Sequence, residues 1–377
     1  MSKWVTIWGN ATSVAEHRPE TYAKNITLRY LITPPFKGSR IRLHFSNFCG
    51  TEPVTLNAVT VAAATDRQID TDSLKEVVFS GKQSVTIEAG QELFSDVLTF
   101  DLQPKEVIAV SIYLKDFTLM RSGVVVTGPL SKGFFSVGDT TKISPLPLDY
   151  TRTISTYYFL TGIDALTDDT NRAVICYGDS ITSQSWPDYL ALKCMGGNTA
   201  IIRRAASGTR ILREYKCITY ESYGLCGKNR FEREISTVSG ADTVIIQQGI
   251  NDIIHPVGEE VNPFRPMSDL PTAKELEEGL KFYAGIAKSY NLKVLLGTLL
   301  PIYGWRTYAP FREELKNEFN RLIRENTFAD GYIDFEKYLC SAENPFAFKQ
   351  GFDSGDHLHP SESAYKQMAE TAYGGIM

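Results

Sequence analysis

The sequence lacks any apolar run long enough to cross a lipid bilayer. Residues 1–8 contain neither the apolar core nor the small-residue cleavage site of a signal peptide. The 39 basic and 44 acidic residues are interleaved, so no basic stripe of the kind that binds nucleic acid is present. We therefore expect a cytoplasmic protein without a membrane or nucleic-acid partner.

Cysteine is also scarce, with six residues in a chain of 377, and no C-x-x-C pair occurs. This spacing does not form a disulfide framework, and without a His/Cys cluster a zinc site is not expected. The glycine-rich loops that bind nucleotides are missing as well, so we predict no cofactor and no metal. Cys217 and Cys226 flank a glycine-containing loop and could approach each other, but we expect both to be free thiols.

What the first part of the chain does contain is a series of short β-branched segments separated by turn residues, with no convincing helix. The segments expected to be strands are residues 27–32, 39–45, 54–62, 77–79, 84–87, 97–102 and 107–114. Their regular spacing predicts a β-sandwich or jelly roll. A chain of this length favours two domains, and we assign residues 1–166 to this first, accessory or carbohydrate-binding-like domain.

The polar segment 164–170 is suited to a linker, and apolar strands alternate with helices after it. The expected strands are residues 173–177, 199–202, 243–246, 293–297 and 332–335, and the expected helices are residues 272–290, 310–325 and a segment that follows residue 360. Uninterrupted apolar strands are typical of a parallel sheet that is covered on both faces. Residues 167–377 are therefore predicted to form an α/β domain of the doubly wound type.

Four of these strand or loop ends carry residues suited to acyl-transfer chemistry. Ser180 follows the first strand, Gly208 the second and Asn251 the third, whereas Asp356 and His359 precede the last helix. Ligands of such sheets bind at the carboxyl ends of the strands. A serine nucleophile, a histidine base held by an aspartate, and backbone and amide donors for an oxyanion are thus predicted to converge there.

The four sequence blocks resemble those of the SGNH hydrolases, also called the GDSL esterase/lipase superfamily, over about residues 171–377. Ser180, Gly208, Asn251 and His359 match the four namesake positions, and Asp356 matches the Asp-x-x-His position. The resemblance implies a flavodoxin-like three-layer α/β/α fold with a parallel sheet. It also implies a catalytic triad of Ser180, His359 and Asp356, with an oxyanion hole formed by the Ser180 and Gly208 N–H groups and the Asn251 side chain.

Several neighbouring residues have alternative interpretations. His357 could replace His359 as the base. In some related esterases a backbone carbonyl performs the task assigned to Asp356. Asp179 and Asp252 are expected to brace their own loops, because carboxylates beside glycine turns accept from local N–H groups. His255 could line the pocket, but we expect it in a solvated loop.

The segment after the fourth predicted strand contains aromatic residues, of which Tyr303 and Trp305 are candidate sugar contacts. They could equally do no more than pack their loop. A β-sandwich before an SGNH domain resembles bacterial carbohydrate esterases that remove acetyl groups from xylan or β-mannan. We therefore predict an acetylesterase acting on acetylated oligosaccharides, with the monomer and the homo-oligomer as open alternatives for its assembly. The alternatives are a hydrolase of lipid or simple acyl esters and a non-catalytic carbohydrate-binding protein.

Overall fold

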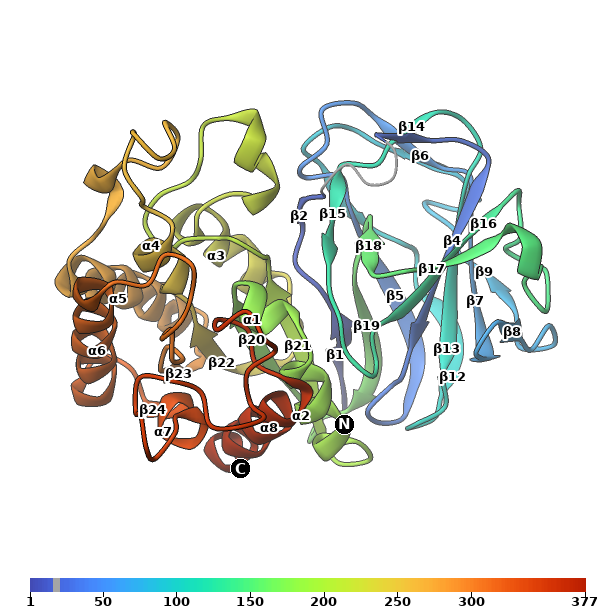
Figure 1. Ribbon diagram of the computed structural model, residues 1–377. Coiled ribbons are helices and arrows are strands. Elements are labelled where there is room, and N and C mark those ends of the chain that lie inside the picture. The colour runs from blue at the N-terminus through green and yellow to red at the C-terminus, as the bar shows by residue number, and fades with distance from the viewer. Residues whose placement is uncertain (16–20) are drawn as a thin grey trace. The chain divides into compact units, whose positions relative to one another are not determined.

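The computed structural model describes residues 1–15 and 21–377 (Figure 1). The chain divides into two compact units. The first comprises Met1–Ala173 with the short segments Cys194–Arg203 and Val238–Gly240, and the second comprises the rest of the described chain. The assignment of residues 1–166 to an accessory domain and of 167–377 to a catalytic domain remains a prediction.

The first unit consists mostly of strands, with one 3-10 turn at Leu148–Tyr150. Its longer strands are β1 (Ser2–Gly9), β4 (Ile26–Ile32), β5 (Gly38–Ser46), β7 (Ala58–Thr65), β12 (Leu98–Leu102), β13 (Ile108–Leu114), β15 (Ser122–Val125), β16 (Lys132–Val137), β17 (Thr151–Ile154) and β19 (Leu160–Asp168). Its shorter strands are β2 (Ser13–Val14), β3 (Tyr22–Ala23), β6 (Val54–Leu56), β8 (Gln68–Ile69), β9 (Lys75–Glu76), β10 (Val85–Ile87), β11 (Glu92–Phe94), β14 (Thr118–Leu119) and β18 (Thr156–Tyr158).

Two larger sheets organise these strands. One has the order β17-β16-β4-β13-β7-β8, and the other has the order β1-β19-β5-β11. The pairs β13–β4 and β13–β7 are antiparallel, so the apolar strand β13 is central and its backbone groups are satisfied on both edges. Packing of these sheets as a sandwich or jelly roll remains a prediction.

The segment expected to be a linker is instead largely strand, because β19 continues to Asp168 and pairs with β1 and β5. The polar residue that suggested a loop, Asp164, is 2% exposed and fully partnered. It accepts hydrogen bonds from Thr6 Oγ1 at 2.6 Å and Ser239 Oγ at 2.8 Å and forms an ion pair with Arg42. The prediction of a strand at 77–79 is also wrong, since only an isolated bridge forms there.

A five-stranded sheet underlies the second part of the chain. Its order is β21-β20-β22-β23-β24, and the pairs β22–β23 and β23–β24 are parallel. The strands are β20 (Arg172–Gly178), β21 (Thr199–Ala205), β22 (Ala241–Gln247), β23 (Lys293–Gly297) and β24 (Gly331–Ile333). If the five strands are numbered in chain order, the sheet order is 2-1-3-4-5. The strand order reverses beside β20, and in sheets of this type ligands bind in a crevice at the carboxyl end of the strands at this point.

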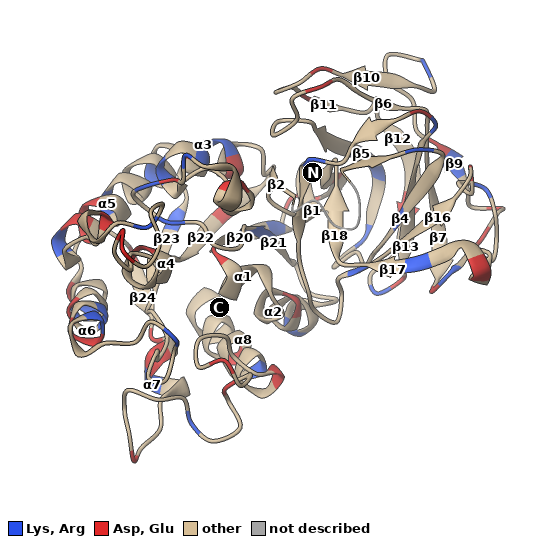
Figure 2. Ribbon diagram, turned by 45° about the horizontal axis from the view of Figure 1, so that its top comes forward, with Lys and Arg blue, Asp and Glu red and all other residues tan. Residues whose placement is uncertain are grey.

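The helices are α1 (Ser180–Ser183), α2 (Trp186–Cys194), α3 (Gly227–Ser236), α4 (Ile250–Ile254), α5 (Ala273–Ser289), α6 (Pro310–Glu325), α7 (Phe335–Leu339) and α8 (Glu362–Ile376), with 3-10 turns η2 (Ile218–Tyr223) and η3 (Met267–Asp269). A capping box of Thr272 and Glu275 begins α5, at the start of the helix that the sequence predicted, and Ser361 caps α8. α3, α5 and α6 lie on one side of the sheet, and α2 and α8 lie on the other (Figures 1 and 2).

Within residues 1–15 and 21–377, no helix has the length and apolar character needed to cross a membrane. The same residues contain no cluster of three or more His, Cys, Asp or Glu side chains placed to hold a metal ion. Acidic and basic residues are interleaved along α3, α5 and α6 (Figure 2). Cys217 and Cys226 both have free thiols.

Candidate active site

Ser180 is presented by a tight strand-to-helix turn. It begins α1 directly after β20, and Asp179 caps this helix by accepting from the Ile181 N–H at 3.1 Å. Gly178 precedes the cap in a position without room for a side chain. A Cβ there would lie 2.4 Å from both the Gln247 carbonyl oxygen and Thr182 Oγ1. The close packing of β20 against β22 thus fixes where the serine hydroxyl emerges.

Three of the predicted catalytic residues form a continuous chain of contacts. Ser180 Oγ lies 2.9 Å from His359 Nε2, and His359 Nδ1 lies 2.6 Å from Asp356 Oδ2. A neutral imidazole that donates from Nδ1 to the carboxylate presents Nε2 as an acceptor for the serine proton. The structure thus brings together residues separated by 179 positions in the order that nucleophilic catalysis needs.

The Asp356 carboxylate is held by the same turn that positions the histidine. Its Oδ1 accepts from the backbone N–H groups of His359 at 2.8 Å and Leu358 at 3.0 Å. Partial burial raises the pKa of Asp356, but the hydrogen bonds from the His359 ring and from the backbone outweigh it, so the pKa lies below the ordinary value. His357 pairs with Asp353 instead, at 2.6 Å, which leaves His359 as the histidine that contacts Ser180.

Gly208 has a left-handed backbone, with a φ of +77°, and lies in tight contact with an aromatic ring. A Cβ at this position would lie 2.2 Å from Tyr223 Cδ1, so glycine is required both by conformation and by space. Tyr223 ends η2, a segment for which the sequence pattern suggested no role. The ring therefore forms a wall beside the predicted oxyanion donor.

Asn251 lies in the first turn of α4 and is 3% exposed. Its Nδ2 donates to the Thr209 carbonyl oxygen at 3.1 Å, and the second amide hydrogen remains for a ligand. The adjacent Asp252 does not brace its own loop as expected. Its carboxylate accepts from the N–H groups of Ile211 at 2.7 Å and Leu212 at 3.1 Å, which ties the Asn251 turn to the segment after Gly208.

Asp179 and Asp252 are buried carboxylates next to the site, and burial changes the pKa of both. Removal from water raises the pKa of Asp179 to about 7 and that of Asp252 to about 6. Hydrogen bonds from backbone N–H groups and the nearby Arg230 guanidinium partly offset the effect on Asp179. Both carboxyl groups therefore keep their protons to a higher pH than exposed carboxyl groups do.

The expectation of a solvated His255 is wrong. The residue follows α4, is 6% exposed, and stacks on Tyr223 with a centroid distance of 5.1 Å and an interplanar angle of 21°. Burial and nearby arginines lower the pKa of His255 well below its ordinary value, so the ring is neutral. The stacking could not be anticipated from spacing, because it depends on the path of the long η2 segment.

Arg230 on α3 was not recognised from the sequence. It is 2% exposed, donates to the Gly178 carbonyl oxygen at 2.6 Å, and lies over the Tyr177 ring at 4.3 Å. A further contact of 3.4 Å joins it to Thr209 Oγ1. It thereby links the turn that carries Ser180 to the turn that carries Gly208. The apolar spacing of Phe231 and Ile235 could have indicated the helix but not this contact.

The predicted sugar contacts lie in the loop after β23. A Cβ at Gly304 would lie 2.9 Å from His357 Cγ, so this loop adjoins the turn that contains the histidines. Tyr303 is 48% exposed and packs edge to face against Tyr308 at 5.1 Å. Trp305 is partly buried beneath the Arg306 guanidinium, at 4.5 Å. Contact of Tyr303 and Trp305 with substrate remains a prediction.

The second part of the chain is similar to known proteins. The sequence profile of the GDSL-like lipase/acylhydrolase family matches residues 164–372, which is more than half of the chain. A GDSL-like lipase from Bacteroides thetaiotaomicron is 21% identical over 54% of this chain and 87% of its own, with a TM-score of 0.38. A putative acylhydrolase from Bacteroides fragilis is 19% identical over 55% and 88%, with a TM-score of 0.41.

A catalytic mutant of an acetylxylan esterase from Geobacillus stearothermophilus is 18% identical over 55% of this chain and 94% of its own, with a TM-score of 0.41. No curated protein matches the sequence. The profile match by itself covers the strands and turns that hold Ser180, Gly208, Asn251 and His359. The chain belongs to the GDSL-like lipase/acylhydrolase family and is a hydrolase that acts on esters.

Proposed function

We propose that this hydrolase is a serine esterase that removes O-acetyl groups from mannan- or xylan-derived oligosaccharides through an acyl-enzyme intermediate. The observation that carries the proposal is the contact chain from Ser180 Oγ through His359 to Asp356, with distances of 2.9 and 2.6 Å. Such a chain lets a hydroxyl act as a nucleophile at neutral pH, because the base is already aligned with its proton.

In the proposed mechanism Ser180 Oγ attacks the ester carbonyl carbon while its proton passes to His359 Nε2. The negative charge that develops on the carbonyl oxygen is stabilised by the Ser180 and Gly208 N–H groups and by the Asn251 amide. The carbon–oxygen bond to the sugar then breaks, and the sugar oxygen takes the proton from His359. Water attacks the acyl-enzyme by the same route, and acetate leaves while Ser180 regains its proton.

The preference for a small acyl group is supported by Tyr223. Its ring lies against Gly208 and is backed by the buried His255, so the wall cannot retreat without disturbing a stacked pair. The carbohydrate preference is supported by the exposed Tyr303 ring, which suits the C–H face of a sugar. A cytoplasmic location, as expected from the sequence, is part of the same proposal.

Acetate release from defined acetylated manno- and xylo-oligosaccharides tests this function directly. We expect turnover of these substrates and, on p-nitrophenyl esters, a preference for acetyl over butyryl and longer chains, because Tyr223 restricts the space beside Gly208. Absence of acetate together with a preference for long chains would instead identify a hydrolase of lipid esters. Acetate release from only one glycan would identify the substrate.

Replacement of Asn251 tests the oxyanion assignment. For Asn251→Ala we expect kcat to fall by about 10²- to 10³-fold, because a donor of this kind is worth that much in acyl transfer. The KM should change little, since the interaction strengthens only as charge develops. Steady-state kinetics on p-nitrophenyl acetate measure both, with calorimetry as a check that the variant is folded. A rise in KM at unchanged kcat would contradict the role.

A further inference from the structure

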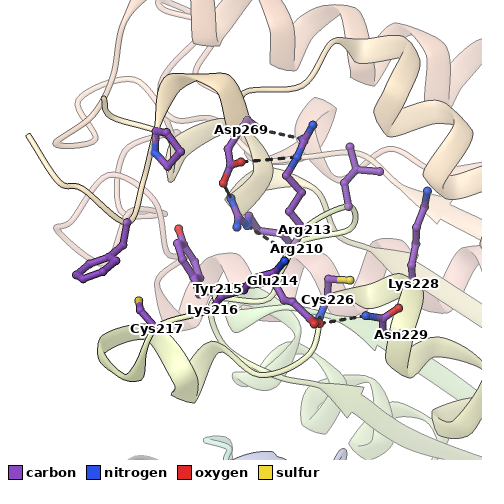
Figure 3. Close-up of a pocket in the computed structure, with 13 residues that line it drawn as sticks. Arg210, Arg213, Glu214, Tyr215, Lys216, Cys217, Cys226, Lys228, Asn229 and Asp269 are labelled. Carbon is purple, nitrogen blue, oxygen red and sulfur yellow. Dashed lines mark hydrogen bonds and ion pairs between the residues drawn. The ribbon is translucent and has the colours of Figure 1, made fainter. Parts of the chain in front are cut away.

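A second concave site lies beside the segment that follows Gly208. It is a cavity of about 630 Å³, within the size range of small-ligand sites (Figure 3). It does not include Ser180, Asp356 or His359. Its first lining residue is Arg210, only two positions after Gly208, so the two Cα atoms are at most about 7 Å apart. The segment that carries the predicted oxyanion donor Gly208 therefore continues directly into the lining of this cavity.

The acidic side chains of this cavity are already engaged. Asp269 pairs with Arg210 at 2.9 Å, lies 3.7 Å from Arg213 Nε, and has the two guanidinium groups beside it (Figure 3). Glu214 accepts from the Cys226 N–H and from Asn229 Nδ2, both at 3.1 Å. Both carboxylates are thus held by the protein.

The basic side chains of this cavity outnumber its acidic side chains. Arg210, Arg213, Lys216 and Lys228 supply four positive charges against the two negative charges, which leaves a formal excess of two. Lys216 and Lys228 are exposed, and neither forms an ion pair within the part of the chain that the structure describes. Lys228 Nζ lies over the Phe282 ring at 5.8 Å, a contact that cancels no charge. Because the carboxylates face their own partners, both lysines keep a positive charge that attracts an anionic ligand.

Apolar and aromatic surfaces complete the lining. Phe264 is 48% exposed, and Pro266 and Tyr215 belong to the same cavity. The Arg210 guanidinium lies over the Tyr215 ring at 4.3 Å and holds it in place. Flat rings next to cations suit a ligand with both C–H faces and a carboxylate. A sugar acid has this combination.

We propose that this cavity binds a carboxylate-bearing sugar, a uronate unit, of the same glycan that is deacetylated at Ser180. The inference rests on the proposed function, because the cavity is assigned to a part of its substrate. Lys216 and Lys228 attract the carboxylate, while the exposed Phe264 ring contacts the sugar. The site makes acetylated acidic oligosaccharides better substrates than neutral ones of the same length.

The test compares acetylated xylo-oligosaccharides with and without one glucuronic acid branch. We expect the wild-type protein to show a five- to tenfold lower KM for the branched substrate, as two exposed ion pairs would provide. In the double variant Lys216→Gln/Lys228→Gln this difference should disappear, with kcat and the neutral substrate unaffected. Lys288→Gln, which removes an exposed lysine at the end of α5, is the matched control and should retain the difference. A higher salt concentration should also reduce this difference in KM, because it screens the exposed charges.

Equal KM values for the two substrates in the wild-type protein, or an equal response of both substrates to the lysine substitutions, would overturn the inference. Binding is measured separately by calorimetry with Ser180→Ala and a deacetylated glucuronate-branched oligosaccharide. If that ligand binds through the lysines while no acetate is released from any substrate, the proposed function fails and the uronate site stands. If acetate is released and the ligand binds no better than a neutral oligosaccharide, only the uronate site fails.

Discussion

Replacement of Ser180 by alanine is expected to lower kcat by about 10⁴-fold or more, because the nucleophile of a triad cannot be replaced by the remaining groups. Ser180 Oγ makes its contact with His359 at 2.9 Å in a half-buried position, so its loss removes no core packing. We therefore expect the fold to persist, with a melting temperature close to that of the wild type. Acetate release and calorimetry on the same preparation measure the two effects.

A matched control distinguishes the nucleophile from a general effect of losing a hydroxyl. Ser185→Ala removes a serine from the same stretch of chain, and its activity should stay within about twofold of wild type. A fluorophosphonate should label Ser180 covalently in the wild-type protein and leave Ser180→Ala unlabelled. Undiminished activity in Ser180→Ala would show that another residue attacks the ester. Absence of labelling in the wild type would favour a non-catalytic, carbohydrate-binding protein.

The residues that meet at the site could be named in advance because each follows a recognisable element. The apolar runs at β20, β21 and β22 predict buried strands, and parallel strands place their carboxyl ends at a common edge. Position at that edge predicts that Ser180 and Asn251 are neighbours, and the contact that the structure shows for Ser180 is the one with His359. Local signals also predicted α5, whose capping box is formed by residues three positions apart.

What the sequence could not predict depends on contacts between distant segments. Asp164 resembled a loop residue because its partners Thr6 and Arg42 are more than a hundred positions away. The same reason hid Arg230, whose hydrogen bond to Gly178 joins two turns of the site. His255 was misjudged because the ring that buries it, Tyr223, belongs to a segment without periodic pattern. Polar residues that are satisfied by long-range partners cannot be distinguished by composition from solvated ones.

The pH dependence of stability is expected to change when Asp179 is replaced by asparagine. Asp179 is fully buried, one of its carboxylate oxygens accepts from the Ile181 N–H, and burial raises its pKa from 3.8 to about 7. The folded state therefore holds this proton more tightly than the unfolded state. The resulting stabilisation is complete below about pH 4 and is lost progressively as the pH rises to about 7.

Asparagine is neutral at every pH and retains an oxygen that can accept from the Ile181 N–H. Wild type and Asp179→Asn should thus have similar stability near pH 4, whereas at pH 8 the variant should be more stable by on the order of 4 kcal/mol. For a unit of this size that corresponds to a rise in melting temperature of roughly 10 °C. Calorimetry from pH 4 to pH 8 measures the difference between the two proteins, in which the parallel contribution of Asp252 largely cancels.

Glu343→Gln, at an exposed position in the same part of the chain, provides the control and should leave the pH profile unchanged. If the variant gains no stability at pH 8, the carboxylate of Asp179 is stabilised in its charged form, and Arg230 is the cation placed to do so. A gain in stability accompanied by lost activity would have a different meaning. It would show that a negative charge beside Ser180 is retained for catalysis at the expense of stability.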